Sequence, residues 1–270
     1  MKFSVLMSVY GKENPKLFDL ALNSIFNNTI HPDEMVLVCD GPLTNELNDI
    51  IANYIERYKN ILEVIRRPVN SGLAAALNIG LEHVKAEWVV RADSDDININ
   101  TRFEVIRDFI KNNPDVAVFG SHIIEVSPDG TKLATRKVPL DDYAIKRRLK
   151  NRNPFNHMTV AFKVDIAKRL GGYPILAFRE DYGLWAKMAA NGCKMANIDQ
   201  VLVHATTGEN MYRRRGGISY AFGEFAFQKF LVKNNLKTFP EACFSAVLRS
   251  LVFLMPTSVR KFVYEKFLRH

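Results

Sequence analysis

The stretch WVVRADSDD at residues 88–96 decides how the rest of the sequence is interpreted. Its short apolar run is typical of a strand buried in a parallel sheet, and ligands of open α/β sheets bind beyond the carboxyl ends of the strands. Three carboxylates follow the run, and hard oxygen ligands of this kind favour Mg²⁺ or Mn²⁺. Aspartates are also common in polar turns that cap a following helix. The stretch therefore indicates either a divalent-cation site made by Asp93, Asp95 and Asp96 or an ordinary turn.

Length and charge limit the kinds of protein to which such a site can belong. The chain has 270 residues, of which 47% are hydrophobic, so it can form one large α/β domain or a domain with an appendage. Lysine and arginine number 37 and aspartate and glutamate 29, which gives a formal net charge of +8. The basic excess is concentrated late in the chain and indicates anionic partners, namely phosphates, anionic lipid or nucleic acid.

The cysteines and the N-terminus indicate the compartment. Cys39, Cys193 and Cys243 are odd in number, widely spaced and set in apolar contexts. We expect reduced core thiols in a reducing compartment rather than disulfide partners or zinc ligands. The N-terminal run MKFSVLMSVYG is too short for the apolar region of a signal peptide and has no small-residue cleavage site. It is therefore expected to form the first strand of a cytoplasmic protein.

The first half of the sequence alternates strand and helix patterns. Apolar runs predict strands at residues 3–9, 35–39, 62–65 and 87–92. Helical spacing of apolar residues predicts intervening helices at residues 17–28, 47–55 and 73–84. The third helix has apolar residues nearly all round and is expected to be well buried. Four β-α steps in about 110 residues predict a mostly parallel, Rossmann-like sheet with right-handed crossovers and flanking helices.

The second half is less regular. Extended segments are expected at residues 116–126, 132–138, 159–162 and 194–204, the second of them returning antiparallel to the first after a turn at 128–130. A helix is expected at 180–190, where Asn191-Gly192 supplies the stop. From residue 216 the patterns are helical to the end, apart from breaks near Pro240 and Pro256.

Several separated motifs together match a known family. They are SVLMSVYGKE at 4–13, VLVCDGP at 36–42, NSGLAAALNIGL at 70–81, RADSDD at 91–96 and REDYGLW at 179–185. In this order they resemble the family 2 glycosyltransferases, α/β proteins of GT-A fold that typically use a divalent metal and a nucleotide diphosphate sugar. The segments NPFNHMTVAFK at 153–163 and MYRRRGG at 211–217 resemble the bacterial transferases that assemble O-antigen, capsule and amylovoran-type exopolysaccharide units.

The resemblance covers roughly residues 3–215 and implies a division of the chain. Residues 1–215 are expected to form the GT-A catalytic domain, in which 1–112 is the nucleotide-binding half and 113–215 the acceptor-side half. Residues 216–270 are expected to form a C-terminal helical extension.

On the nucleotide side, the resemblance implies roles for residues at the ends of the first two strands. The Tyr10 ring can stack on a nucleobase, uracil by family analogy, and the Ser8 hydroxyl can bond the base edge or the ribose. Ordinary strand-end packing is the alternative for Tyr10. Asp40 can accept the base N–H, or can be an ordinary turn aspartate before Gly41. Many relatives have two acids here, whereas this chain has Cys39-Asp40, so Asp40 alone must do that work.

The loop before the third helix is also expected to approach the nucleotide. Gly72 permits a tight turn that brings the helix N-terminus close to a phosphate, and Asn70 lies in the same loop. One of Arg66 and Arg67 is expected to contact the nucleobase or a phosphate, and we assign Arg67, with a solvated surface position as the alternative. Packing is the expected reason for Asn78.

Two groups of acids carry the chemistry that the resemblance implies. Asp93 is expected near the ribose and sugar as well as the metal, Asp95 as a direct metal ligand, and Asp96 as an outer or alternative ligand. Asp181 is expected to be the general base that deprotonates the acceptor hydroxyl, with Glu180 as its orienter or substitute, giving inversion at the anomeric carbon. Acids at a helix N-terminus also favour the helix dipole without any catalytic role.

Basic residues near the end of the catalytic domain suit anionic ligands. Arginine forks match phosphate oxygens, so Arg214 is assigned to the donor diphosphate and Arg213 and Arg215 to a lipid-pyrophosphate acceptor. A solvated basic run is the alternative for all three. His157 is assigned to the acceptor side, with a structural role as the alternative, and His204 is assigned no role.

The C-terminal segment suggests a further partner. Residues 244–255 and 259–267 place apolar side chains at helical spacing, and basic residues accompany them. Neither segment can span a bilayer, which needs about 20 residues. A basic amphipathic helix pair at an anionic membrane surface fits the pattern, and packing against the catalytic domain is the alternative.

Three classes of function remain. The leading one is an inverting, metal-dependent transferase that moves a sugar from a nucleotide diphosphate sugar, a UDP-hexose, to a polyprenyl-pyrophosphate-linked saccharide at the inner face of the cell membrane. A catalytically silent nucleotide-sugar-binding or scaffold subunit would be expected to lack the metal acids or the base, which this chain retains. A nucleic-acid partner is not expected, since no recognised binding motif supports one. A sugar nucleotidyltransferase would need a glycine-rich signature after the first strand, which is missing.

Overall fold

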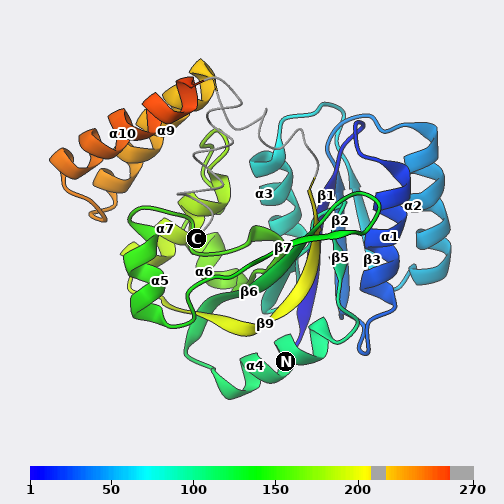
Figure 1. Ribbon diagram of the computed structural model, residues 1–270. Helices are drawn as coiled ribbons and strands as arrows, with labels where there is room; N and C mark the ends of the chain where they lie inside the picture. The colour runs from blue at the N-terminus through cyan, green and yellow to red at the C-terminus, as the bar shows by residue number, and fades with distance from the viewer. Residues whose placement is uncertain (208–216, 256–270) are drawn as a thin grey trace.

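The computed structural model describes residues 1–207 and 217–255 and arranges them around one curved sheet (Figure 1). Within those residues nine strands join the sheet in the order β3-β2-β1-β4-β8-β6-β9-β5, with β7 paired to β6 outside this path. The sheet combines a parallel half from the first part of the chain with a mixed half from the second.

The parallel half follows the predicted alternation. Its elements are β1 (Phe3–Val9), α1 (Pro15–Phe26), β2 (Glu34–Cys39), α2 (Asn45–Tyr58), β3 (Leu62–Arg66), α3 (Leu73–His83) and β4 (Trp88–Arg91). β1 pairs in parallel with β2 on one side and with β4 on the other, and β3 pairs in parallel with β2. The predicted parallel sheet is therefore confirmed, and the carboxyl ends of all four strands meet at one edge.

The mixed half is built from shorter and more varied elements. They are β5 (Ile97–Asn98), α4 (Arg102–Asn112), β6 (Val116–Val126), β7 (Lys132–Arg136), α5 (Asp142–Leu149), a 3-10 turn η1 (His157–Thr159), β8 (Ala161–Lys163), α6 (Val164–Arg169), α7 (Glu180–Ala190) and β9 (Lys194–Thr206). β8 is antiparallel to both β4 and β6, so it joins the two halves. The antiparallel return of β7 onto β6 and the bounds of α7 are as predicted.

Three helices of this half, α4, α5 and α6, were not predicted from the sequence. α6 has only six residues, too few to show a helical period. α5 buries only Ile145 and Leu149 among charged neighbours, so its apolar stripe is too thin to recognise.

Alternate residues of the buried strands feed two separate cores. Val5 and Met7 of β1 point into the core under α1 and α2, whereas Leu6 points into the core under α3 and α7. Figure 1 shows α1 and α2 on one face of β1 to β3 and α3 on the other. α3 packs closely against β1 at Gly80, since a Cβ added there would lie only 2.4 Å from Leu6 Cδ1. Its outer face is more exposed than the sequence predicted.

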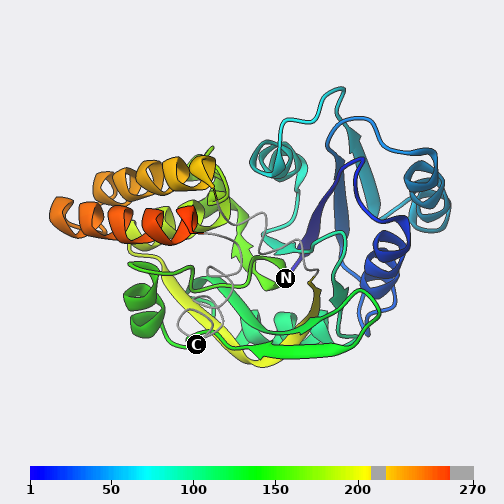
Figure 2. The ribbon, with the colours of Figure 1, turned by 45° about the horizontal axis from the view of Figure 1, so that its top comes forward.

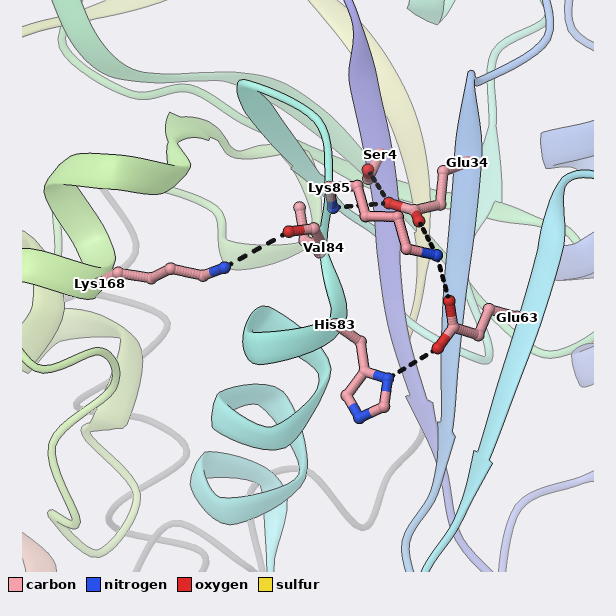
Figure 3. Close-up of polar contacts among 7 residues, drawn as sticks. All are labelled: Ser4, Glu34, Glu63, His83, Val84, Lys85 and Lys168. Atoms are coloured by element: carbon pink, nitrogen blue, oxygen red, sulfur yellow. Dashed lines mark hydrogen bonds and ion pairs between the residues drawn. The ribbon is translucent and has the colours of Figure 1, made fainter.

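The edge of the sheet opposite the carboxyl ends is fastened by a polar cluster (Figure 3). Glu34 accepts hydrogen bonds from Ser4 Oγ at 2.5 Å and from the backbone N–H of Lys85 at 3.0 Å. Glu63 lies 2.7 Å from the His83 ring and 3.0 Å from Lys85 Nζ, and the His83 contact is the main cause of its lowered pKa. Exposed pairs of this kind contribute little to stability. The cluster ties the C-terminal end of α3 to β2 and β3.

The C-terminal part forms a helical hairpin of α9 (Ile218–Lys233) and α10 (Phe239–Leu254). A capping box between Thr238 and Glu241 starts α10. Figures 1 and 2 show the hairpin beside α7, at the end of the molecule away from α1 and α2. In the described ranges 1–207 and 217–255, no helix combines the length and the apolar composition needed to cross a membrane.

The cysteines differ in exposure, which corrects part of the sequence interpretation. Cys39 is buried, and burial raises the pKa of its thiol to about 11. Cys193 is half-buried, whereas Cys243 is exposed on α10 and is not a core thiol. Its neighbour Phe244 is also exposed, whereas Ala242 on its other side is buried.

Candidate active site

Three aspartates gather where β4 ends. Asp93, Asp95 and Asp96 each offer a carboxylate oxygen within 4.8 Å of the others. Asp96 is buried and its Oδ1 accepts a hydrogen bond of 2.8 Å from the backbone N–H of Thr206, the last residue of β9. Its Oδ2 is buried without a hydrogen-bond partner in the part of the chain that the structure describes. An acceptor left in this state is costly unless something fills it.

The electrostatics of this group also suit a cation. Burial, followed by the charges of Asp93 and Asp95, raises the pKa of Asp96 well above its ordinary value. A divalent cation would offset this repulsion and give the unpaired oxygen a partner. The residues present therefore fit Mg²⁺ or Mn²⁺, as the sequence suggested.

Two buried arginines lie next to the aspartates, where Arg91 bonds to Asp93 and Arg102 bonds to the backbone of Arg91. Arg91 is 1% exposed and donates a hydrogen bond of 2.5 Å to Asp93 and another of 3.3 Å to the carbonyl of Leu6. Arg102 donates a hydrogen bond of 2.8 Å to the carbonyl of Arg91. Burial lowers the pKa of Arg102 to about 9. The sequence left Arg91 without a role and did not single out Arg102, because neither position reveals its burial.

Asp40 lies at the end of β2 and organises the loop before α3. Its carboxylate is 2.5 Å from Arg67 Nη1 and accepts the backbone N–H groups of Ser71 at 3.1 Å and Gly72 at 2.9 Å. A carboxylate offers about four acceptor positions, so one remains for a nucleobase N–H. Gly72 has φ +89°, in the region that favours glycine, and begins α3 beside Asn70, whose side chain accepts the same N–H at 3.2 Å.

The two arginines at the end of β3 differ in their surroundings. Arg67 is largely buried against Asp40, whereas Arg66 reaches outward to Asn48 at 2.7 Å. Of the pair, only Arg67 therefore directs its side chain to Asp40. Ser8 and Tyr10, both half-buried, end β1 between the strands that carry Asp40 and Asp93.

The acid pair begins α7. Asp181 Oδ2 accepts a hydrogen bond of 2.6 Å from the side-chain amide of Asn153. Burial raises the pKa of Asp181, and burial followed by the charge of Asp181 raises that of Glu180 to about 7. The charges of Arg91 and Asp93 also act on Glu180. The acid pair therefore lies near enough to Asp93, about 85 residues earlier in the sequence, for the charge of that aspartate to act on it.

A histidine packs against α7, where the ring of His157 lies 6.3 Å from that of Trp185. His157 Nε2 lies 3.2 Å from the hydroxyl of Tyr173, and burial, followed by the charge of Arg91, lowers its pKa well below the ordinary value. Asn78 exchanges two hydrogen bonds of 2.8 Å with the backbone of Tyr173, which confirms its expected packing role. His157 is thus held close to α7 and remains assigned to the acceptor side only as a prediction.

Some predicted site residues are not described by the structure, and two residues near the acid pair were not predicted. Arg213, Arg214 and Arg215 lie outside the described residues. Asn153 and Arg136 were not assigned a role from the sequence. The charge of Arg136 opposes the rise that burial causes in the pKa of Asp181. Asn153 stood inside the motif at 153–163, which was the one signal that could have pointed to it.

A mixed α/β sheet with donor-side residues, clustered aspartates and an acid pair at one edge defines the GT-A class of nucleotide-sugar-dependent transferases. The model of the family Glycosyl transferase family 2 matches residues 4–171, and the chain belongs to this family. It is therefore a glycosyltransferase. The match ends before the acid pair on α7.

Relatives match along nearly the whole chain. The UDP-Gal:alpha-D-GlcNAc-diphosphoundecaprenol beta-1,3-galactosyltransferase of Escherichia coli is 43% identical over 270 residues, covering 99% of this chain and 97% of the relative. The Amylovoran biosynthesis glycosyltransferase AmsE of Erwinia amylovora is 34% identical over 266 residues, covering 98% of both chains.

Solved structures share the fold. S. aureus TarS 1-349 in complex with UDP-GlcNAc has a TM-score of 0.67 at 21% identity, covering 93% of this chain and 72% of that one. Mannosyltransferase PcManGT from Pyrobaculum calidifontis, in complex with GDP-Man and Mn2+, has a TM-score of 0.61 at 17% identity, covering 98% and 84%. At these identities the likeness concerns the fold alone.

Proposed function

We propose that the protein transfers galactose, with inversion, from UDP-galactose to an N-acetylglucosamine carried on a polyprenyl diphosphate, as a step in bacterial surface polysaccharide synthesis. The observation that carries the proposal is the acid pair Glu180-Asp181 beside the aspartates of β4, at the edge where the parallel strands end. The donor and acceptor follow the printed name of the Escherichia coli relative, which is similar over nearly its full length.

The donor nucleotide occupies the carboxyl ends of β1, β2 and β4. The Tyr10 ring stacks on the uracil, the Ser8 hydroxyl bonds the base edge or the ribose, and the remaining acceptor position of Asp40 takes the base N–H. Arg67, Asn70 and Gly72 shape the loop beside it. Asp93 lies near the ribose and sugar, and Arg214 contacts the diphosphate.

Asp95 would hold Mg²⁺ or Mn²⁺, with Asp93 as a further ligand and Asp96 as an outer or alternative one. When bound, the cation supplies positive charge that stabilises the departing diphosphate. The buried unpaired oxygen of Asp96 and the mutual repulsion of the three carboxylates support this assignment.

Asp181 is the general base. Its carboxylate removes the proton from the acceptor hydroxyl as that oxygen attacks the anomeric carbon from the face opposite the diphosphate. The new carbon–oxygen bond forms while the bond from the anomeric carbon to the phosphate oxygen breaks, and UDP leaves with the bonding electron pair. A raised pKa brings the base closer to the working pH, and Glu180 orients it or substitutes for it.

The acceptor approaches from the second half of the chain. We assign residues 1–112 to the nucleotide-binding half of the catalytic domain, 113–215 to the acceptor-side half and 216–270 to the helical extension. His157 contributes to the acceptor side as a neutral imidazole, and Arg213 and Arg215 contact the lipid pyrophosphate.

The helical hairpin places the enzyme on the inner, anionic surface of the cell membrane. After its first turn, the exposed positions of α10 are Cys243 and five apolar residues, Phe244, Val247, Leu248, Leu251 and Leu254. On α9 the large exposed apolar residues are Ile218, Phe222 and Phe225, and the exposed charges are Lys229 and Lys233. A large apolar surface bordered by basic residues suits a lipid interface, where a polyprenyl-linked acceptor also resides.

A transfer assay tests this function directly. The full-length protein is incubated with Mn²⁺, a panel of UDP- and GDP-sugars and an N-acetylglucosaminyl-diphospholipid, and the product is identified by mass and by glycosidase sensitivity. Galactose transfer from UDP-galactose is expected. A silent subunit would bind a UDP-sugar without turnover of any donor, and a preference for another sugar would overturn the donor assignment.

A further inference from the structure

A buried ionic cluster joins the helical hairpin to the start of α7. Glu224 of α9 is fully buried, and its carboxylate accepts hydrogen bonds from the guanidinium of Arg179, from Arg249 at 3.3 Å and from the amide of Gln228 at 2.7 Å. The Arg179 side chain is only 11% exposed. The cluster therefore connects α7, α9 and α10 in the interior rather than at the surface.

Arg179 is the residue directly before Glu180 and Asp181 and occupies the N-cap position of α7. Its guanidinium also lies 5.5 Å from the ring of Tyr220 and 5.4 Å from that of Phe227, both of α9. These contacts fix both the charge and the plane of the side chain. The backbone position from which the acid pair projects is therefore set by residues of the hairpin.

The residue before Arg179 is also held by the hairpin. Phe178 has φ +63°, a conformation that side-chain-bearing residues rarely adopt. Its ring stacks on Tyr220 at a centroid distance of 4.7 Å. A strained backbone of this kind persists only when surrounding contacts enforce it, and such strain is concentrated near functional sites.

A fully buried carboxylate is a poor choice for stability alone. Apolar residues of similar volume often stabilise an interior equally well, whereas a buried ion pair fixes one particular geometry. Here the geometry so fixed is that of the turn that begins α7.

We propose that Arg179 is a positioning residue for the acid pair and that Glu224 of the C-terminal hairpin holds it in place. The hairpin is then a structural part of the active site as well as a surface for the membrane. The positioning role rests on the proposed function, in which Asp181 is the base.

The first test measures the structure of α7 without any substrate. Hydrogen exchange is followed in Glu224→Gln and in the matched control Glu241→Gln, a hairpin residue whose side chain bonds to Thr238 at the start of α10. Glu224→Gln is expected to raise the exchange rate of the first turn of α7 at least about tenfold, with the sheet unchanged, and the control to leave it unchanged. Unchanged exchange at α7, or a uniform loss of protection throughout the protein, would overturn the proposal.

The second test separates positioning from donor binding. Glu224→Gln and Arg179→Gln are expected to lower kcat for transfer about tenfold or more while KM for the donor stays within about twofold. Arg179→Lys should recover part of the rate, and Arg179→Gln with Glu224→Gln should be no slower than Arg179→Gln alone. A rise in the donor KM as large as the fall in kcat would contradict the proposal. Losses of kcat that add up in the double variant would also contradict it. A wild-type protein without galactosyltransferase activity would refute the proposed function and leave the exchange experiment decisive.

Discussion

Asn153 donates a hydrogen bond of 2.6 Å to the carboxylate of Asp181, from a loop 28 residues earlier in the chain. The amide holds one oxygen of the proposed base, and the carboxylate also accepts a hydrogen bond from the backbone N–H of Tyr182. The amide also favours the ionised carboxylate and so opposes the rise in pKa that burial causes.

Replacing Asn153 by Ala is therefore expected to weaken transfer and to move its pH dependence. Loss of the hydrogen bond raises the pKa of Asp181 further, so the acid limb of kcat should shift to higher pH and the rate at neutral pH should fall about tenfold. Rate profiles of both proteins measure the shift. Asn151→Ala, an exposed change in the same loop, serves as the control. An unshifted acid limb in Asn153→Ala would show that the amide does not act on the base.

Asp181→Asn is expected to remove transfer and to spare donor binding, because the base acts on the acceptor oxygen. Loss of a general base usually costs about 10² to 10⁴ in rate. Turnover and UDP affinity are measured side by side for Asp181→Asn and Glu180→Gln. Near-normal turnover in Asp181→Asn together with loss in Glu180→Gln would reverse the assignment within the pair.

The wild-type pH profile should rise with pH. A base works as its carboxylate, and burial raises the pKa of Asp181 above its ordinary value, so the acid limb of kcat should lie at higher pH than an ordinary aspartate would give. Because the pKa of Glu180 is raised to about 7, the folded state binds more protons than the unfolded state between the ordinary value of 4.5 and about 7. The contribution of Glu180 to the free energy of unfolding therefore falls as pH rises through that interval. An acid limb at the ordinary pKa of an aspartate would contradict the raised pKa of Asp181.

Activity is expected to require a divalent cation. Asp95→Ala should abolish transfer while circular dichroism and the unfolding temperature stay close to those of the parent, because a half-buried residue of the cluster is removed without opening the core. Asp129→Ala, in the turn between β6 and β7, is a control at an exposed aspartate. Undiminished transfer in excess EDTA would rule out the metal.

Membrane binding should depend on the apolar face of the hairpin. Leu248→Asp with Leu251→Asp should reduce co-sedimentation with anionic vesicles, and added salt should weaken binding by the parent. Leu20→Asp on α1, also an exposed helical leucine, is the control. Point changes are preferable to deletion after residue 240, since α10 supplies Arg249 to the cluster around Glu224. No binding of the parent at low salt would identify the hairpin as a packing element only.

Local sequence patterns were sufficient to predict the alternation of strands and helices in the first half of the chain. Periodicity and turn residues act over a few positions, and the parallel sheet follows from them. Because parallel strands present their carboxyl ends at one edge, the proximity of Ser8, Asp40 and Asp93 was also predictable. The thin apolar stripe of α5 and the exposure of Cys243 lay beyond such patterns.

What the sequence by itself determined is the order of elements in the parallel half, the family and the acids placed at strand and helix ends, because these are local properties of the chain. Only the tertiary structure decided which partner each of them has. It paired Arg67 rather than Arg66 with Asp40, Asn153 with Asp181, and Glu224 with Arg179. Each of these contacts joins separate elements that meet through packing, and no spacing along the chain encodes a distance of that kind.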